Sequence, residues 1–207
     1  MSTNETRIEV DPDLPTLRVI RDFDAAPEKV FRAWTDPDLV SRWLGPRETE
    51  MRIDSWDATT GGSYRYAAWR GDEEIARFYG SFHEVRPGQR LVQTFTWEGA
   101  PDGVSLDTTV FEDLGDGRTR VTTTSVVETI EIRDMIVASG MDKGVIEGYE
   151  KLDELLSGDQ DHDAEKHEHP GHQAVPEAPD ARDHARVRAE PRAGEAPRPH
   201  RPRTPRS

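Results

Sequence analysis

Polar side chains suited to acid–base chemistry fall on segments whose alternation predicts β-strands. They are Arg65, Arg77, His83, Glu84, Thr94, Asp107 and Thr108. His83 is the only histidine before residue 159, and an imidazole titrates near neutral pH, which makes it the natural acid or base of the set. The sequence identifies no partner for it, so we expect a surface or hydrogen-bonded strand residue. Glu84 and Arg65 are expected to form a structural ion pair, and we predict no catalytic residue.

Motifs of cofactor and nucleophile chemistry are missing from the sequence. It contains no Walker-type loop, no dinucleotide glycine fingerprint, no HExxH and no Ser/His/Asp arrangement. The chain has no cysteine, which excludes disulfides, thiolate metal ligands and a cysteine nucleophile. We therefore expect no cofactor, and we favour a binding protein over an enzyme.

A second group of candidate ligands lies towards the end of the sequence. Four histidines alternate with carboxylates there, namely His162, His167, His169 and His172 with Asp161, Asp163, Glu165 and Glu168. Imidazole and carboxylate donors hold zinc or nickel in proteins. The segment has a low-complexity composition, however, and a chain without a fixed fold binds metal weakly. No metal site is predicted.

A change in composition divides the chain near residue 158. Beyond it there is no Leu, Ile, Met, Phe, Tyr or Trp, while eight of the 15 prolines and six of the seven histidines follow it. Such a segment cannot bury enough apolar surface to offset its conformational entropy. We predict a flexible leader at 1–15, one folded domain at 16–158 and a disordered tail at 159–207, which is His-rich and acidic first, then Arg/Pro-rich.

Charge and hydropathy limit the partners of the predicted domain. Residues 1–158 contain 31 acidic and 18 basic side chains, so long-range repulsion disfavours nucleic acid and anionic membranes. No apolar run approaches the roughly 20 residues of a membrane span, and residues 1–10 lack the apolar core of a signal peptide. We expect a soluble, cytoplasmic protein without a membrane or nucleic-acid partner; the oligomeric state is left open.

Turn residues and alternation indicate the elements that hold these side chains. A strand is predicted at 16–24, and two short helices follow it, one beginning at Pro27 and one at Pro37. Six further strands between Gly- and Pro-rich turns are predicted at 52–56, 63–70, 74–85, 90–97, 104–112 and 118–127. Gly80, inside one of these strands, suggests a bend or bulge.

A long amphipathic helix completes the pattern. Apolar residues recur at steps of three or four over 135–156, with charged residues between them. Gly140 interrupts the period and Ser139 with Asp142 resembles a capping box, so we expect the helix to restart there and to end at Gly158. A sheet with one apolar face needs such a helix to cover it, which predicts an α+β fold.

Six short motifs, in this order, resemble those of a known superfamily. They are APEKVFRAW (26–34), WLGP (43–46), GGSYR (61–65), GSFHEVRP (80–87), RLVQTF (90–95) and SGM (139–141). Together with the order of elements they look like the START-like helix-grip (SRPBCC) superfamily. Within it the match is to the bacterial branch that resembles the C-terminal domain of the activator of the ninety-kilodalton heat-shock protein ATPase (AHSA-type). The resemblance covers roughly residues 16–157.

The resemblance implies a curved antiparallel sheet of about seven strands wrapped around a long C-terminal helix, with two short helices after the first strand. It also implies a hydrophobic cavity between sheet and helix that binds a small hydrophobic or amphipathic molecule. Residues expected to contact that ligand are Trp34, Arg65, Trp69, Phe78, Phe82, Thr94, Met135, Met141, Val145 and Tyr149.

Two alternatives to simple ligand binding stay open. The first is an enzyme of the polyketide cyclase or dehydratase type, which requires a polar pair inside the cavity. The second is a stress-response or co-chaperone-like interaction module, which requires an exposed apolar patch instead of an enclosed pocket.

Overall fold

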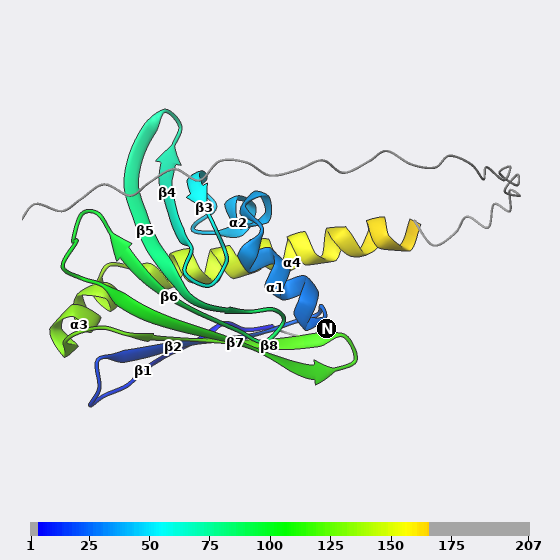
Figure 1. The fold of residues 1–207 in the computed structure, drawn as a ribbon, viewed down its shortest axis with the longest axis horizontal. Coiled ribbons are helices and arrows are strands. Elements are labelled where there is room, and N and C mark those ends of the chain that lie inside the picture. Colours follow the sequence, from blue (N-terminus) through cyan, green and yellow to red (C-terminus); the bar gives the residue numbers. More distant parts are fainter. Residues whose placement is uncertain (1–3, 166–207) are drawn as a thin grey trace, which may run out of the picture. The chain divides into compact units, whose positions relative to one another are not determined.

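The computed structural model describes residues 4–165 of the chain, and within this range eight strands and four helices follow one another (Figure 1). The N-terminal half contains β1 (Arg7–Val10), β2 (Thr16–Phe23), α1 (Pro27–Thr35), α2 (Pro37–Trp43), β3 (Glu50–Trp56) and β4 (Ser63–Arg70). The remainder contains β5 (Glu73–Arg86), β6 (Arg90–Trp97), β7 (Ser105–Gly115), β8 (Arg118–Val126), α3 (Ile130–Ala138) and α4 (Met141–Glu165).

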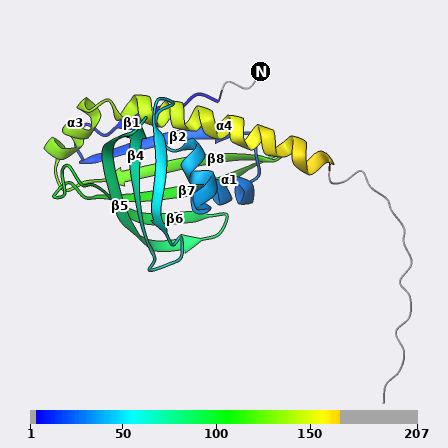
Figure 2. The ribbon, with the colours of Figure 1, turned by 90° about the horizontal axis from the view of Figure 1, so that it is seen from above.

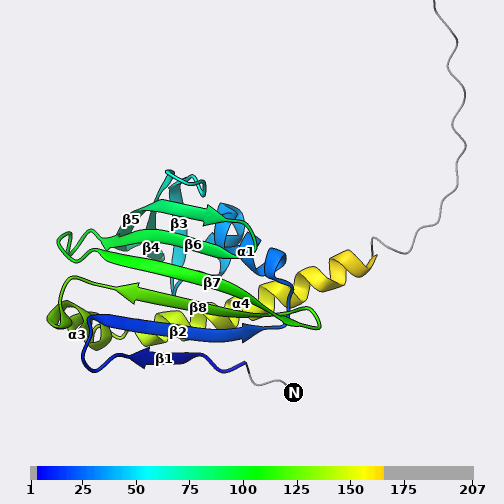
Figure 3. The ribbon, with the colours of Figure 1, turned by 60° about the horizontal axis from the view of Figure 1, so that its bottom comes forward.

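The strands form one antiparallel sheet in the order β1-β2-β8-β7-β6-β5-β4-β3. Figure 3 shows β2, β8, β7 and β6 side by side, with α4 behind them. Figure 2 shows α4 extending along the sheet, with α3 at one end of it. The predicted α+β class, the curved antiparallel sheet and the two short helices are confirmed.

The beginning of the chain differs from the predicted flexible leader at 1–15. Arg7–Val10 forms β1, which pairs with β2 from Arg7 opposite Ile20 to Val10 opposite Leu17 and raises the strand count from seven to eight. The following turn is held by Arg133 of α3, a buried side chain that donates to the carbonyl oxygens of Asp11 and Leu14. A guanidinium that donates to two carbonyl oxygens of the turn fixes the turn against α3. The polar composition of residues 1–15 does not predict this contact.

The end of α4 also differs from the prediction, because the helix continues through Gly158 to Glu165. A glycine ends a helix when it adopts positive φ, and Gly158 is not among the described glycines that do so. In a helical conformation it costs only about 1 kcal/mol relative to alanine. The rest of the predicted tail, 166–207, lies outside the described residues, and so do the side chains of the histidine-rich group (His162, His167, His169, His172).

The core between α4 and the sheet is built from aromatic and aliphatic side chains. Phe23 of β2 and Leu152 of α4 are fully buried. Around Phe23, the ring centroid of Trp34 lies 6.0 Å away and that of Tyr149 5.5 Å away, both close to edge-on. Arg21 of β2 is also buried and forms an ion pair with Asp153 of α4. These contacts fix α4 against β2, which is the arrangement the helical period of residues 135–156 requires.

Helix α4 passes close to the end of α2 at Gly148 and leaves more space at Gly144. A Cβ at Gly148 would lie 3.0 Å from the carbonyl oxygen of Trp43, whereas a Cβ at Gly144 would meet only Pro46 at 3.6 Å. We expect Gly144→Ala to stabilise the protein by about 0.5–1 kcal/mol, because alanine favours helix. Gly148→Ala is expected to destabilise it by about 1 kcal/mol, since overpacking outweighs that gain. Urea denaturation of the two variants measures both; equal effects would contradict the close approach.

Candidate functional site

A cavity of about 690 Å³ lies between the inner face of the sheet and helices α3 and α4. Its walls come from β2, β3, β4, β6, β7 and β8, from all four helices, and from the connection between β6 and β7. Trp97 of β6 and Met135 of α3 also line it, and their side chains are 47% and 64% exposed. These two residues therefore mark where the cavity opens to solvent.

The walls are rich in aromatic rings. Eight of the lining residues are aromatic, namely Trp34, Trp43, Trp56, Tyr64, Tyr66, Phe95, Trp97 and Tyr149. Two of the indoles are fixed by hydrogen bonds to carbonyl oxygens of α1: Trp43 Nε1 donates to Ala33 at 2.8 Å, and Trp56 Nε1 donates to Thr35 at 3.0 Å. A cavity of this size with fixed aromatic walls suits a small apolar molecule.

Five of the ten residues predicted to contact a ligand line this cavity. They are Trp34, Met135, Met141, Val145 and Tyr149, and all of them lie on helices. Met141 and Val145 are half-buried one turn apart at the start of α4, where their side chains form part of the wall opposite the sheet. Flexible methionines at the helical wall tolerate ligands of varied shape.

The five predicted residues on strands do not line the cavity, namely Arg65, Trp69, Phe78, Phe82 and Thr94. Arg65 pairs with Glu98 on the exposed surface, and Trp69 packs under the guanidinium of Arg52, 4.3 Å from the ring centroid. Phe82 packs against Tyr64 and Phe78 against Tyr66, and in both pairs the tyrosine and not the phenylalanine lines the cavity. The Thr94 hydroxyl accepts a hydrogen bond from the N–H of Ser81 and so holds two strands together.

The predicted ion pair between Arg65 and Glu84 is wrong. Arg65 lies opposite Tyr79 in the β4–β5 register, and Glu84 is five residues further along β5, roughly 16 Å away at the strand rise. Glu84 pairs with Arg86 and Arg90 instead. Of the other polar candidates, His83 is exposed on β5.

Arg77 is likewise occupied outside the cavity, because it pairs with Asp54 and Glu74. Thr108 lies on the outward-facing side of β7, between the exposed residues Leu106 and Val110. Asp107 is therefore the one polar candidate of the seven that lines the cavity.

Asp107 projects into the cavity because β7 carries its polar residues inward. Ser105, Asp107 and Thr109 line the cavity, whereas the apolar residues Leu106 and Val110, which alternate with them along the strand, are exposed on the outer face. Alternation alone suggests the opposite orientation, with the apolar set buried. The signal for the true orientation is Phe111, which continues the inward set and is buried against Phe31 of α1.

The Asp107 carboxylate is surrounded by neutral groups. Its Oδ1 accepts a hydrogen bond from Ser105 Oγ at 3.0 Å, and Ser125, directly opposite on β8, also donates to it. Gln93 lies opposite it on β6. Burial raises the pKa of Asp107 more than these hydroxyl donors lower it. Burial thus disfavours the charged form of Asp107 in the folded protein.

The raised pKa of Asp107 should change how the stability of the protein depends on pH, and an Asp107→Asn variant should lack that change. A raised carboxyl pKa means that the folded protein holds the proton more tightly, so the wild-type chain loses stability as pH rises from 3.8, the ordinary aspartate value, through the folded value. The variant has no such loss. The difference in unfolding free energy, variant minus wild type, should therefore increase with pH across this window. Above the window it should stay constant. Urea titrations from about pH 4 to about pH 8 measure the difference; a constant difference would contradict the shift.

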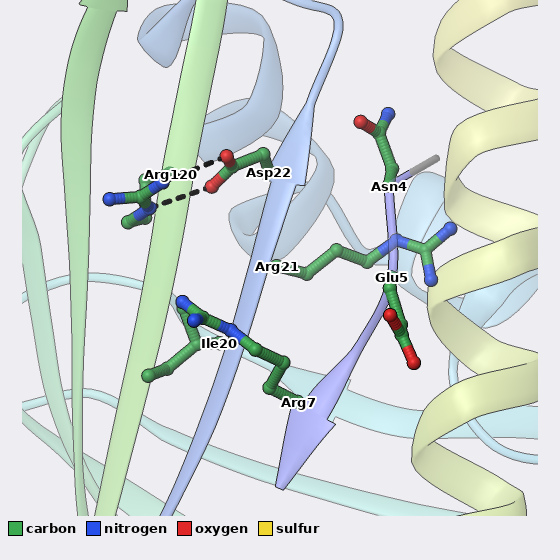
Figure 4. A pocket seen from close by; sticks show the side chains of 7 residues that line it. All are labelled: Asn4, Glu5, Arg7, Ile20, Arg21, Asp22 and Arg120. Atoms are coloured by element: carbon green, nitrogen blue, oxygen red, sulfur yellow. Dashed lines mark hydrogen bonds and ion pairs between the residues drawn. The ribbon is translucent and has the colours of Figure 1, made fainter. Parts of the chain in front are cut away.

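A second, smaller hollow of about 270 Å³ lies on the other side of β2, beside β1 (Figure 4). Asp22 and Arg120 form a bidentate ion pair there, with N–O distances of 2.7 and 2.9 Å, and the hydrogen bond from Arg120 lowers the pKa of Asp22. Arg21 extends from the same hollow towards α4 and Asp153. Asp22 and Arg120 pair with each other and Arg21 pairs with Asp153, so these three charged side chains have a structural role.

No helix in residues 4–165 is long and apolar enough to cross a membrane. Within residues 4–158, whose side chains are described, no group of three or more His, Asp or Glu side chains is placed to hold a metal ion.

Comparison with known proteins identifies relatives over most of the chain. The family model described as "Activator of Hsp90 ATPase homolog 1-like protein" matches residues 24–157. A crystal structure from Rhodobacter sphaeroides is 26% identical, covers 74% of this chain and 99% of its own, and superposes with a TM-score of 0.68. A solution structure from Arthrobacter aurescens is 27% identical, covers 80% and 98%, and gives 0.67. No curated protein matches the sequence.

Proposed function

The chain belongs to the family of activator of Hsp90 ATPase homolog 1-like proteins, and on that premise we propose that it binds a small apolar or amphipathic molecule between its sheet and α4. The family match and the similar structures also confirm the START-like helix-grip assignment. The observation that carries the proposal is the cavity of about 690 Å³, which falls within the range of small-molecule sites.

The ligand is proposed to lie against residues that the helices supply. Trp34 and Tyr149 form an aromatic wall, with their ring centroids 5.8 Å apart. Met141 and Val145 face the same space from α4, and Met135 lies at the opening. A small molecule is favoured over nucleic acid because the domain is strongly acidic. A cytoplasmic location is proposed on the absence of cysteine, which fits a reducing compartment.

A cyclase or dehydratase activity is the less favoured alternative. It needs a proton donor and a proton acceptor in the cavity, and Asp107 supplies one titratable group at the inner wall. The neighbouring tyrosines are poor partners near neutral pH, because burial raises the pKa of Tyr149 to about 12 and raises those of Tyr64 and Tyr66 as well. These phenols stay protonated, which suits hydrogen bonding to a ligand better than proton transfer.

An interaction module of the kind suggested by the family description is supported by a different surface. Val104, Leu106, Val110 and Val126 are 41–46% exposed beside or on β7 and β8, and Leu106 lies opposite Val126. Exposed apolar side chains grouped on one sheet face suit contact with another protein. This surface is separate from the cavity, so one experiment distinguishes the two functions.

Native mass spectrometry of the full chain, purified from its own host, is that experiment. We expect the chain to carry a single small molecule at close to equal stoichiometry, released on denaturation. A chain that instead retains a protein supports the interaction module. A chain that is empty, and that also fails to bind the neutral apolar dye Nile red, overturns the ligand-binding proposal.

A further inference from the structure

The inner wall of the cavity carries a polar stripe across the middle of the sheet. Gln93, Asp107 and Ser125 lie directly opposite one another on β6, β7 and β8. The next inward pair on β7 and β8 is Thr109 and Thr123, whose hydroxyl oxygens are 3.0 Å apart. One end of a ligand in this cavity therefore meets hydrogen-bonding groups, while the rest meets aromatic and aliphatic side chains.

The charge of this stripe is uncompensated. Within residues 4–158, whose side chains are described, no lysine, arginine or histidine lines the cavity. The only other acidic residue in its walls is Asp102, which is exposed in the connection between β6 and β7. The buried guanidinium of Arg21 is paired with Asp153 of α4. A carboxylate in a largely apolar cavity without a cation favours a ligand that brings one.

The aromatic walls favour the same charge. The rings of Trp34 and Trp43 lie 4.6 Å apart, and the ring of Tyr149 lies 6.0 Å from that of Trp43. The faces of such rings carry a negative quadrupole that attracts ammonium groups. An anionic ligand, such as a fatty acid, would meet both this quadrupole and the Asp107 carboxylate, so the walls disfavour it.

We infer that the ligand of this cavity is an amphipathic organic cation, whose protonated amine lies at Asp107 and whose apolar body lies against the aromatic and methionine walls. This inference rests on the proposed function and specifies its ligand class. It assigns to Asp107 the role of binding the ligand's ammonium group, which the shape of the cavity alone does not indicate.

Binding is linked to pH through the same carboxylate. The titratable groups that face Asp107 are Tyr64 and Tyr66 of β4 and Tyr149 of α4, with Asp102 at the opening. Because their pKa values are raised by burial, the tyrosines stay neutral at the pH values concerned. An ammonium group beside Asp107 stabilises its charged form, so amine binding should weaken as acid protonates Asp107.

Three probes of equal chain length separate charge from hydrophobicity, namely 1-octylamine, 1-octanol and octanoate. Each is titrated against the full chain at neutral pH in moderate salt, which screens attraction to the chain's net charge of −14. Four of the five tryptophans line the cavity, so intrinsic fluorescence reports binding, and calorimetry checks it. We expect octylamine to bind at least about tenfold more tightly than octanol, and octanoate to bind most weakly.

Asp107→Asn is the decisive variant, because it keeps the shape of the side chain and removes its charge. Octylamine should then lose at least about tenfold in affinity, while octanol changes by no more than about twofold. Glu112→Gln removes a charge from an exposed position of the same strand that does not line the cavity, and it serves as the matched control, with little effect expected.

Octanol or octanoate binding as tightly as octylamine overturns the inference while leaving the proposed function standing. So does an Asp107→Asn variant that still prefers octylamine. A chain that binds none of the three probes and no Nile red overturns the proposed function as well.

Discussion

Met141→Arg will leave the domain folded and weaken the binding of 1-octanol by at least about 100-fold. Met141 is the first residue of α4; it is half-buried, lines the cavity and contacts the core around Trp34 and Tyr149. An alkyl chain gains about 0.8 kcal/mol for each buried CH₂, and the introduced guanidinium takes the place of about four such groups. The loss of about 3 kcal/mol corresponds to the stated factor. Nile red displacement by octanol measures it.

The same substitution at Met135 is the control. Met135 also lines the cavity but is 64% exposed on α3, so an introduced arginine can extend into solvent. We expect less than about a fivefold change there, within 1 kcal/mol. Far-UV circular dichroism must show both variants folded. Octanol binding that survives in a folded Met141→Arg protein would place the ligand elsewhere and count against the cavity.

The predicted ligand contacts on helices all line the cavity, whereas those on strands do not. Trp34, Met135, Met141, Val145 and Tyr149 all line the cavity, since the side of a helix that is buried follows from spacing along the chain alone. On strands a shift of one residue reverses every side chain. Register shifts interrupt the pairing of β3 with β4, β4 with β5 and β5 with β6, so alternation cannot be extrapolated across these strands.

Asp107 also shows that local sequence does not determine which side of a strand faces the cavity. Its type and its strand were evident in the sequence, but the apolar neighbours Leu106 and Val110 suggested that the opposite face of β7 is buried. The orientation depends on contacts far away in sequence, such as Phe111 with Phe31 and Asp107 with Ser125. Tertiary pairing therefore decides which polar residue enters the cavity, and local pattern does not.

Gly80 was predicted to mark a bend or bulge, and the structure gives the glycine a more specific role. The register shift itself falls at His83, between Phe82 and Glu84. Near Gly80 the Tyr64 hydroxyl crosses from β4 to donate to the carbonyl oxygen of Thr94 on β6, at 2.7 Å. A Cβ on Gly80 would lie 2.0 Å from that carbonyl oxygen and 2.5 Å from the hydroxyl. Only a residue without a side chain allows this hydrogen bond to form.

Gly80→Ala is accordingly expected to destabilise the protein by about 3 kcal/mol. Forcing β5 and β6 apart costs roughly 1–3 kcal/mol, and a buried tyrosine hydroxyl that loses its acceptor costs about 1–3 kcal/mol more. Tyr64→Phe removes the hydroxyl alone and should cost only about 1 kcal/mol. Urea denaturation gives both values.

The double variant separates the two contributions to this loss. Combining Gly80→Ala with Tyr64→Phe should cost less than the sum of the single changes, because the hydroxyl is one of the atoms with which the new methyl collides. The remaining loss comes from the clash with the Thr94 carbonyl oxygen, which Tyr64→Phe leaves in place. Since Tyr64 also lines the cavity, Gly80→Ala should weaken octanol binding as well. A Gly80→Ala protein within 1 kcal/mol of the wild type would mean that β5 and β6 separate easily at this point, and that the curved wall is not fixed by the Tyr64 to Thr94 hydrogen bond.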